Sequence, residues 1–238
     1  MNQKPIIFTH IQKTAGTSVM KELLYRNYKQ EEIKRFWGGY GIKKFIFSDT
    51  SSYNVFTGHM PYGIHHFIKR ECEYFTFLRD PIKRAISQYN FIKNNIEAGG
   101  MKNKYKDSYN NIALKDVFDQ RVVLNPFKGG LVDNLQTRML AGYLYFPLSK
   151  NSELMLSRAK KNLEKKYKVF GIQEYYEDSI KQLVESFEWD YSPTGMIAKK
   201  TQKKDEVDDE TQQVLFENHN LDIKLYSFAQ ELFKSRIK

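Results

Sequence analysis

The chain has 238 residues, of which 41% are hydrophobic and 15% aromatic, and it carries a formal net charge of +10. This composition is typical of a globular protein and argues against a disordered chain, and a single cysteine, Cys72, excludes an internal disulfide. No stretch approaches the roughly 20 apolar residues that span a bilayer, and the N-terminus lacks a signal-peptide pattern. We therefore expect one domain over residues 1–238, no integral membrane segment and a cytoplasmic location. The positive charge favours an anionic partner: a nucleotide, an acidic substrate, nucleic acid or a membrane surface.

The first clear element is Ile6–Thr9, a β-branched and aromatic run that predicts a buried strand. A loop of small and polar residues, Gln12–Ser18, follows directly, and a helical apolar pattern comes next. This order forms an anion site, because the first amide groups of a helix have no intrahelical partner. Gly16 permits a ligand to approach closely, and Lys13 adds a positive charge. The loop therefore predicts a phosphate site; the alternative is an ordinary strand-to-helix turn with a Ser or Thr cap.

The residue order in this loop differs from that of the P-loop nucleotide kinases. Their pattern, G-x-x-x-x-G-K-[ST], places the lysine near the end of the loop. Here Lys13 stands at the beginning, and hydroxyl groups follow it at Thr14, Thr17 and Ser18. We also find no recognisable set of Mg²⁺ ligands, which a kinase would need.

Further strands are predicted along the next part of the chain. Lys29–Arg35 is a charged stretch, and Phe36–Gly41 is interpreted as a glycine-rich loop. Apolar runs at Phe45–Phe47 and Val55–Thr57 predict the second and third strands, and Tyr74–Leu78 predicts the fourth. Because helical patterns alternate with these runs, we expect a mostly parallel sheet.

A histidine follows the third predicted strand. His59 lies between a glycine and a proline-containing turn, at the end of the sheet where open α/β proteins bind their ligands. This position makes it a candidate for catalysis, with a structural histidine as the alternative. His65 and His66 lie nearby, but their spacing matches no zinc signature, so we expect no metal site.

Arg79 stands at the carboxyl end of the fourth predicted strand, and Pro81 marks the first turn of a helix over about 82–98. Ser87 lies about two turns into this helix. A guanidinium and a hydroxyl from these places are suited to hold one phosphate from two sides. The alternative is that Arg79 pairs with Asp80. The expected core face of the helix consists of Ile82, Ala85, Ile86, Tyr89 and Ile92.

The second half of the chain is dominated by helical patterns. Two polar stretches, Gly99–Asn111 and Lys199–Lys204, read as loops that either cover a site or are simply solvated. One more strand is expected at Val169–Ile172. Predicted helices cover Leu131–Ala141, Ser152–Lys165, Ser179–Phe187 and a last amphipathic segment with Leu225, Phe228, Leu232 and Phe233. The fold class is thus α/β: a P-loop-like, mostly parallel sheet flanked by helices, with a helix-rich C-terminal half.

Two of these motifs point to one family. Thr9–Ser18, THIQKTAGTS, closely resembles the 5′-phosphosulfate loop of the carbohydrate sulfotransferases, although Gln12 replaces a frequent proline. Phe77–Tyr89, FLRDPIKRAISQY, resembles their 3′-phosphate segment, and the order of the two motifs also matches. Within that family the chain resembles the uronyl and heparan sulfate 2-O-sulfotransferases and their bacterial homologues. Weaker resemblances cover Thr57–Tyr62, Asn134–Gly142, Val169–Glu174, Lys200–Thr201 and the segment around Asp222.

The resemblance implies transfer of a sulfuryl group from 3′-phosphoadenosine 5′-phosphosulfate (PAPS) to a hydroxyl, with the bisphosphate PAP as the product and no metal. His59 would be the general base, and Lys13 would stabilise the leaving group. The residues implied in cofactor binding are Lys13, Thr14, Ala15, Gly16, Thr17, Ser18, Arg79, Ser87, Lys200 and Thr201.

The acceptor is less defined by the sequence. A basic protein suits a glycan or glycoconjugate with a free hydroxyl, while a lipid-linked sugar or a small alcohol stays open. Tyr62 and Arg138 are candidate acceptor contacts. A P-loop nucleotide kinase and a non-catalytic nucleotide- or nucleic-acid-binding protein are the alternative functions. We expect no nucleic-acid partner, because no DNA- or RNA-binding signature is present.

Overall fold

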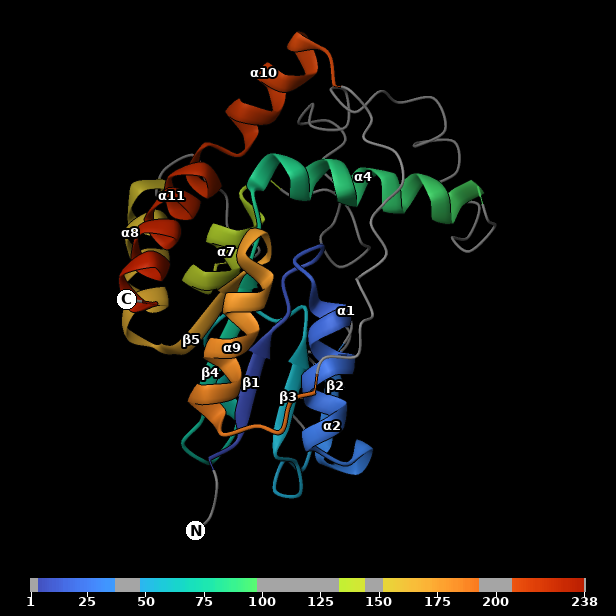
Figure 1. The fold of residues 1–238 in the computed structure, drawn as a ribbon. Helices are drawn as coiled ribbons and strands as arrows, with labels where there is room; N and C mark the ends of the chain where they lie inside the picture. Colours follow the sequence, from blue (N-terminus) through green and yellow to red (C-terminus); the bar gives the residue numbers. More distant parts are fainter. Residues whose placement is uncertain (1–3, 37–47, 98–132, 144–151, 193–206, 238) are drawn as a thin grey trace.

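A computed structural model describes residues 4–36, 48–97, 133–143, 152–192 and 207–237 (Figure 1). In these residues one sheet of five parallel strands has the order β2-β3-β1-β4-β5. The strands are β1 Ile6–Thr9, β2 Ile33–Phe36, β3 Val55–Gly58, β4 Glu73–Leu78 and β5 Tyr167–Ile172. Their carboxyl ends lie at one edge, so the loops after β1, β3 and β4 are neighbours.

Helices cover both faces of the sheet, and α4 runs across its carboxyl edge (Figure 1). After β1 the chain forms one helical run, in which a π-helical turn separates two short α-helical pieces. The pieces of this run are α1 Gly16–Val19, η1 Met20–Leu24 and α2 Tyr25–Asn27. The longer helices are α4 Pro81–Glu97, α7 Leu135–Ala141, α8 Ser152–Lys165, α9 Tyr176–Phe187, α10 Asp209–Asn218 and α11 Asn220–Arg236. Single 3-10 turns are η2 Gln30–Glu32, η3 Ile64–Phe67 and η7 Gln173–Tyr175.

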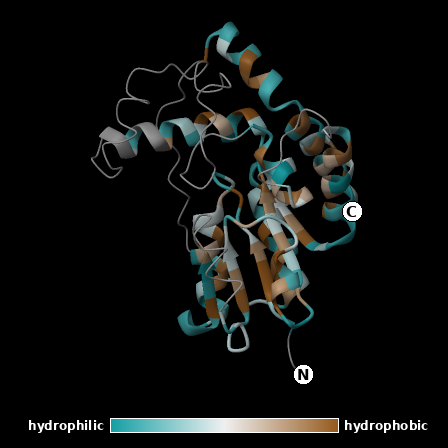
Figure 2. Cartoon of the chain, turned by 180° about the vertical axis from the view of Figure 1, so that it is seen from behind, coloured by the Kyte–Doolittle hydropathy of each residue, from teal (hydrophilic) through white to brown (hydrophobic). Residues whose placement is uncertain are grey.

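The strands are apolar on both sides because both faces of the sheet are covered. In β1, Ile6 and Phe8 pack with the α1–α2 run and α9, whereas Ile7 packs on the opposite face. Figure 2 shows the result: hydrophobic strands lie at the centre, and polar residues lie mainly on the outer helices.

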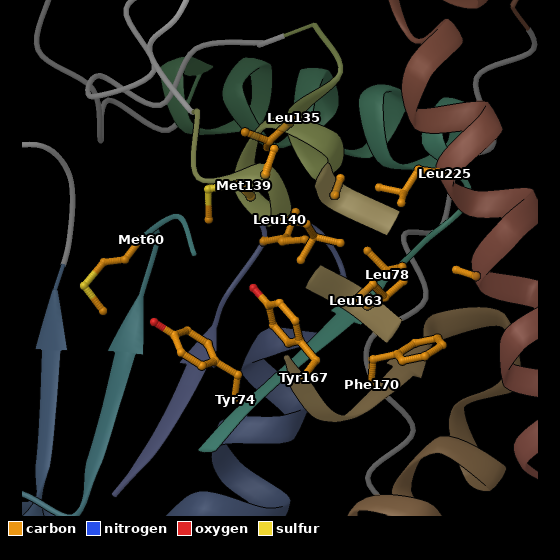
Figure 3. Close-up of a cluster of buried hydrophobic side chains, with 14 of the residues drawn as sticks. Met60, Tyr74, Leu78, Leu135, Met139, Leu140, Leu163, Tyr167, Phe170 and Leu225 are labelled. Atoms are coloured by element: carbon orange, nitrogen blue, oxygen red, sulfur yellow. The ribbon is translucent and has the colours of Figure 1, made fainter. Parts of the chain in front are cut away.

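The core on the second face joins the sheet to the C-terminal helices (Figure 3). Leu78 of β4, Leu140 of α7 and Leu225 of α11 belong to this one buried cluster. Burial of one such side chain contributes about 1.5–3 kcal/mol. This packing ties α7 and α11 to the strand end from which Arg79 projects.

The fold class predicted from the sequence is confirmed, and all the described strand pairs are parallel. The helix predicted at Ser152–Lys165 has these bounds in the structure. The strand predicted at Phe45–Phe47 lies outside the described residues. No strand was predicted before Phe36, and the assignment of Phe36 to a glycine-rich loop was wrong, because β2 covers Ile33–Phe36. β2 is an edge strand in which Ile33 and Phe36 are buried but the central residues Lys34 and Arg35 are charged and at least partly exposed, so its four residues showed no apolar run.

The predicted core face of the helix after β4 was also wrong in part. Arg84 and Ala85 are fully buried and Gln88 nearly so, whereas Ile82 and Ile86 are partly exposed. The reason is that α4 crosses the edge of the sheet, where it faces polar residues of the C-terminal half, rather than lying on an apolar sheet face. The spacing of the apolar residues therefore predicted the wrong buried face for this helix.

Candidate active site

The loop between β1 and α1 has a constrained backbone. Lys13 and Ala15 both adopt left-handed conformations with φ of 66°. Such a conformation costs a non-glycine residue roughly 1–2 kcal/mol, so the surrounding contacts must enforce it. One of these contacts is internal: the buried Thr14 hydroxyl donates to the carbonyl of Ile11 at 2.9 Å. The Thr14 side chain therefore supports the loop from inside.

The helical run begins directly after the loop. The amide groups of Ser18 and Val19 donate to the carbonyl of Ala15, at 3.0 and 3.2 Å. The amides of Gly16 and Thr17 precede the first intrahelical bond and lie at the helix end that favours negative charge. The predicted order of strand, loop and helix is thus present, while the role of these amides in phosphate binding stays a prediction.

Gly16 is required by a buried imidazole. A Cβ at this position would lie 1.8 Å from Nε2 of His10, so no other residue fits without displacing the ring. The His10 ring also stacks on Phe8, with a centroid distance of 5.2 Å. Burial, and to a lesser extent the charge of His59, lowers the pKa of His10 to about 3. His10 is therefore a neutral support beneath the phosphate loop.

His59 follows β3 and lies beside His10. Its Nδ1 is 2.7 Å from the carbonyl oxygen of His10, which can only accept, so Nδ1 carries the hydrogen. Nε2 is then the ring atom with a lone pair. Burial lowers the pKa of His59, against the opposing effect of the bond to His10. A neutral imidazole with a fixed tautomer is the form that a general base requires.

Lys13 and Arg79 lie next to each other at the ends of the neighbouring strands β1 and β4. The Arg79 Nη1 donates to the carbonyl of Lys13 at 3.1 Å. The Lys13 ammonium lies 4.6 Å from the ring centre of Phe91, which is 51% exposed on α4. Burial, followed by the charge of Arg79, lowers the pKa of Lys13. Two partly buried cations at one point attract an anion that bears more than one charge.

The Arg79–Asp80 backbone is held from two sides. The Gln136 side chain bonds both the N–H and the C=O of Arg79, at 3.0 and 2.9 Å. The carboxylate of Glu174 accepts from the amide of Asp80 at 3.2 and 3.3 Å and from the hydroxyl of Tyr226 at 2.7 Å. Burial lowers the pKa of Arg79, and the negative charges of Glu174 and Asp80 oppose that shift. Three elements of the C-terminal half thus fix this turn.

The remaining predicted site residues have different surroundings. Ser87 is buried on α4, in the same strand–helix unit as Arg79. Tyr62 is partly buried, and its ring packs near Tyr74, Tyr167 and His65.

Neither Arg138 nor the predicted C-terminal loop residues can be assigned a contact with the site. Arg138 is 7% exposed and pairs with both carboxylate oxygens of Asp133, at 2.9 Å each. Its role as an acceptor contact stays a prediction. Lys200 and Thr201, and the two polar stretches Gly99–Asn111 and Lys199–Lys204, lie outside the described residues.

Sequence reasoning did not assign Gln136, Glu174 or Phe91 to the site, and it weighed His10 only as a substitute base. The first two lie in segments that resemble family segments, but no local pattern connects them to Arg79. Phe91 follows Ser87 by one helical turn, which places it on the same side of α4. That spacing was the available signal.

Other chemistry finds less support in the described residues. There, no group of three or more His, Cys, Asp and Glu side chains is arranged to hold a metal ion. Burial raises the pKa of the Cys72 thiol to about 11, which disfavours the thiolate. None of the helices in the described ranges is long and apolar enough to cross a membrane.

Comparison with known proteins adds an independent observation. A model described as the Sulfotransferase family matches residues 2–229. The chain is 26% identical to heparan-sulfate 6-O-sulfotransferase 1 of Cricetulus griseus over 277 positions, which cover 97% of this chain and 67% of that protein. The Mus musculus protein of that name is also 26% identical, with 97% and 66% covered, and the Homo sapiens protein is 25% identical, with 97% and 66% covered. The chain thus spans about two thirds of the length of these relatives.

Among solved structures, the chain is similar to a crystal structure of the mouse sulfotransferase SULT7A1 complexed with PAP. The TM-score is 0.42 at 12% sequence identity, with 92% of this chain and 65% of that chain covered.

Proposed function

The chain belongs to the sulfotransferase family, and on this basis we propose that it transfers a sulfuryl group from PAPS to a hydroxyl of a carbohydrate acceptor. The observation that carries the proposal is the grouping at the carboxyl edge of the sheet. Lys13, Arg79 and His59 follow the neighbouring strands β1, β4 and β3, with Arg79 bonded to the Lys13 carbonyl and His59 bonded to the His10 carbonyl.

The residues present fit a donor with phosphates at two ends. The loop amides of Thr14–Thr17 and the hydroxyls of Thr17 and Ser18 are suited to the 5′-phosphate, at a helix start, whereas the Ser18 amide already donates to the Ala15 carbonyl. Arg79 and Ser87 are suited to the 3′-phosphate. Lys200 and Thr201, in the C-terminal loop, are proposed to close over the donor.

The donor supplies the sulfuryl group, and the chain's residues handle the proton and the charge. Nε2 of His59 accepts the proton of the acceptor hydroxyl, because Nδ1 is committed to the His10 carbonyl. The Lys13 ammonium stabilises the negative charge that develops on the leaving phosphate oxygen. We propose no metal ion for these steps, since the cations and amides are already in place to supply the positive potential.

The acceptor is proposed to be a glycan or glycoconjugate. The support is the printed name of the relatives, heparan-sulfate 6-O-sulfotransferase, together with the net charge of +10. Tyr62 is proposed as one acceptor contact, because its partly exposed ring lies three residues from His59. A cytoplasmic location stays part of the proposal.

Thermal unfolding in the presence of nucleotides tests the donor site. PAP should raise the apparent stability by about 2.7 kcal/mol at a hundredfold excess over Kd, and this shift should be lost in Arg79→Ala. ATP with Mg²⁺ is the control. If ATP with Mg²⁺ raises the unfolding temperature and PAP does not, the proposal is contradicted and a nucleotide kinase is favoured. Transfer of labelled sulfate from PAPS to desulfated heparan sulfate then tests the acceptor.

A further inference from the structure

The Gln136 side chain pairs with a backbone rather than with another side chain. Its Oε1 accepts from the Arg79 amide at 3.0 Å, and its Nε2 donates to the Arg79 carbonyl at 2.9 Å. Gln136 is 1% exposed, so water does not compete for these bonds. Because the donor and acceptor of a carboxamide are distinct, the pairing admits one orientation of the Arg79 backbone.

Arg79 needs such a partner because it stands just beyond the sheet. The pairing of β4 with β5 ends at Leu78 and Ile172. Buried backbone groups must find hydrogen bonds, and the ladder no longer supplies them at this position. Gln136 thus acts as a substitute strand partner for the residue that carries the guanidinium.

Gln136 is itself held in place by a buried carboxylate. Its backbone amide donates to Oδ2 of Asp222 at 3.1 Å. The amide and the hydroxyl of Thr137 both donate to Oδ1 of Asp222 at 2.7 Å. Asp222 is fully buried near the start of α11, so α11 fixes the first turn of α7. The side chain of Gln136 therefore extends from a rigid base.

We propose that Gln136 is the positioning residue for Arg79 in the nucleotide site. This inference rests on the proposed PAPS-dependent function. Gln136 touches no reacting group in this arrangement; it sets the place from which the Arg79 side chain starts. The Arg79 side chain also donates to the Lys13 carbonyl. By fixing the Arg79 backbone, Gln136 therefore influences both the direction of the guanidinium and the conformation of the phosphate loop.

The test replaces one atom group. Gln136→Glu retains the oxygen that accepts from the Arg79 amide but places a carboxylate oxygen against the Arg79 carbonyl. The Kd for PAP, measured by calorimetry at pH 8, should rise about tenfold or more, as expected for loss of a buried hydrogen bond.

The loss should be reversed by acid. A protonated carboxyl group donates to the Arg79 carbonyl as the amide does, so the ratio of variant to wild-type Kd should fall as pH falls. Asp222, which bonds the residue-136 amide, and Glu174, which bonds the Asp80 amide, should raise the pKa of the new carboxyl. Arg79, and Arg84 through its proximity to Asp222 and Arg79, should lower it. Taking the ratio at each pH removes the titration of PAP and of the shared protein groups.

Asn162→Asp is the matched control. Asn162 is buried on α8, and its Nδ2 donates to the carbonyl of Leu140 at 2.8 Å, at the opposite end of α7. The same amide-to-carboxylate change there should lower the free energy of unfolding while leaving the Kd for PAP at the wild-type value.

The outcomes separate the inference from the function on which it rests. A wild-type Kd in folded Gln136→Glu, or an equal loss in Asn162→Asp, overturns the positioning role while the proposed function stands. Wild-type protein that does not bind PAP overturns both. If Gln136→Glu does not fold, Gln136→Met keeps the side-chain length without either bond, and a wild-type Kd in that variant overturns the positioning role.

Discussion

The buried imidazole of His10 should make the fold sensitive to acid. Its pKa lies at about 3 in the folded chain, against 6.5 for an unperturbed histidine. The unfolded state therefore takes up the proton first as pH falls, and the folded state loses stability. The effect begins near pH 6.5 and continues down to about 3.

The size of the effect follows from the two pKa values. Between pH 8 and pH 5, His10 alone should lower the free energy of unfolding by about 2 kcal/mol, and the loss should reach about 5 kcal/mol below the folded-state value. A loss of about 2 kcal/mol is a large part of the 5–15 kcal/mol that stabilises a typical domain. His59 and His219 shift in the same direction because of burial, so wild-type protein should lose more than His10 alone accounts for.

Urea unfolding of wild type and His10→Gln at pH 8 and pH 5 measures the contribution of His10 to the pH dependence of the free energy of unfolding. The variant should lose about 2 kcal/mol less than wild type between the two pH values. His66→Gln, which removes an exposed imidazole, should behave as wild type. An equal loss in His10→Gln and wild type would refute the argument that a neutral, buried His10 supports the loop.

Three further substitutions and one control variant test the site. Gly16→Ala should cost about 1–3 kcal/mol by overpacking against His10 and should weaken PAP binding. Gly63→Ala meets no atom within 4 Å but is strained by the φ of +107° at that position, so it should lower stability while leaving PAP binding unchanged; equal Kd values for the two variants would contradict the clash. Lys13→Ala should lower kcat about 10²–10³-fold, measured as sulfate transfer under saturating PAPS. His59→Gln should abolish transfer with little change in the Kd for PAP; full activity would mean that another residue is the base.

Local sequence patterns were enough to predict the strands that are buried on both faces and the helices that are strongly periodic. The strands ending near Gly58 and Leu78 read as apolar runs, and the loop before Gly16 has a recognisable composition. The hydrogen bonds that hold the Arg79 backbone could not be predicted from the sequence, because Gln136 and Arg79 are 57 residues apart and meet only through the packing of α7. The burial of Arg84 was missed for a related reason: helical periodicity identifies an apolar face, and this helix buries a polar one.

The strand order has a consequence for how the chain folds. Among the five described strands every pairing is parallel, so none can form as a hairpin. The central strand pairs Ile6 with Val55 and with Glu73, which lie 49 and 67 residues further along (55 − 6 and 73 − 6). Contacts at such separation slow folding, since a long loop must close before any contact stabilises it. β1, apolar on both faces, then stays unpaired while the chain collapses, when exposed strand edges promote aggregation. We therefore expect refolding from denaturant to be slow and its yield to fall with protein concentration.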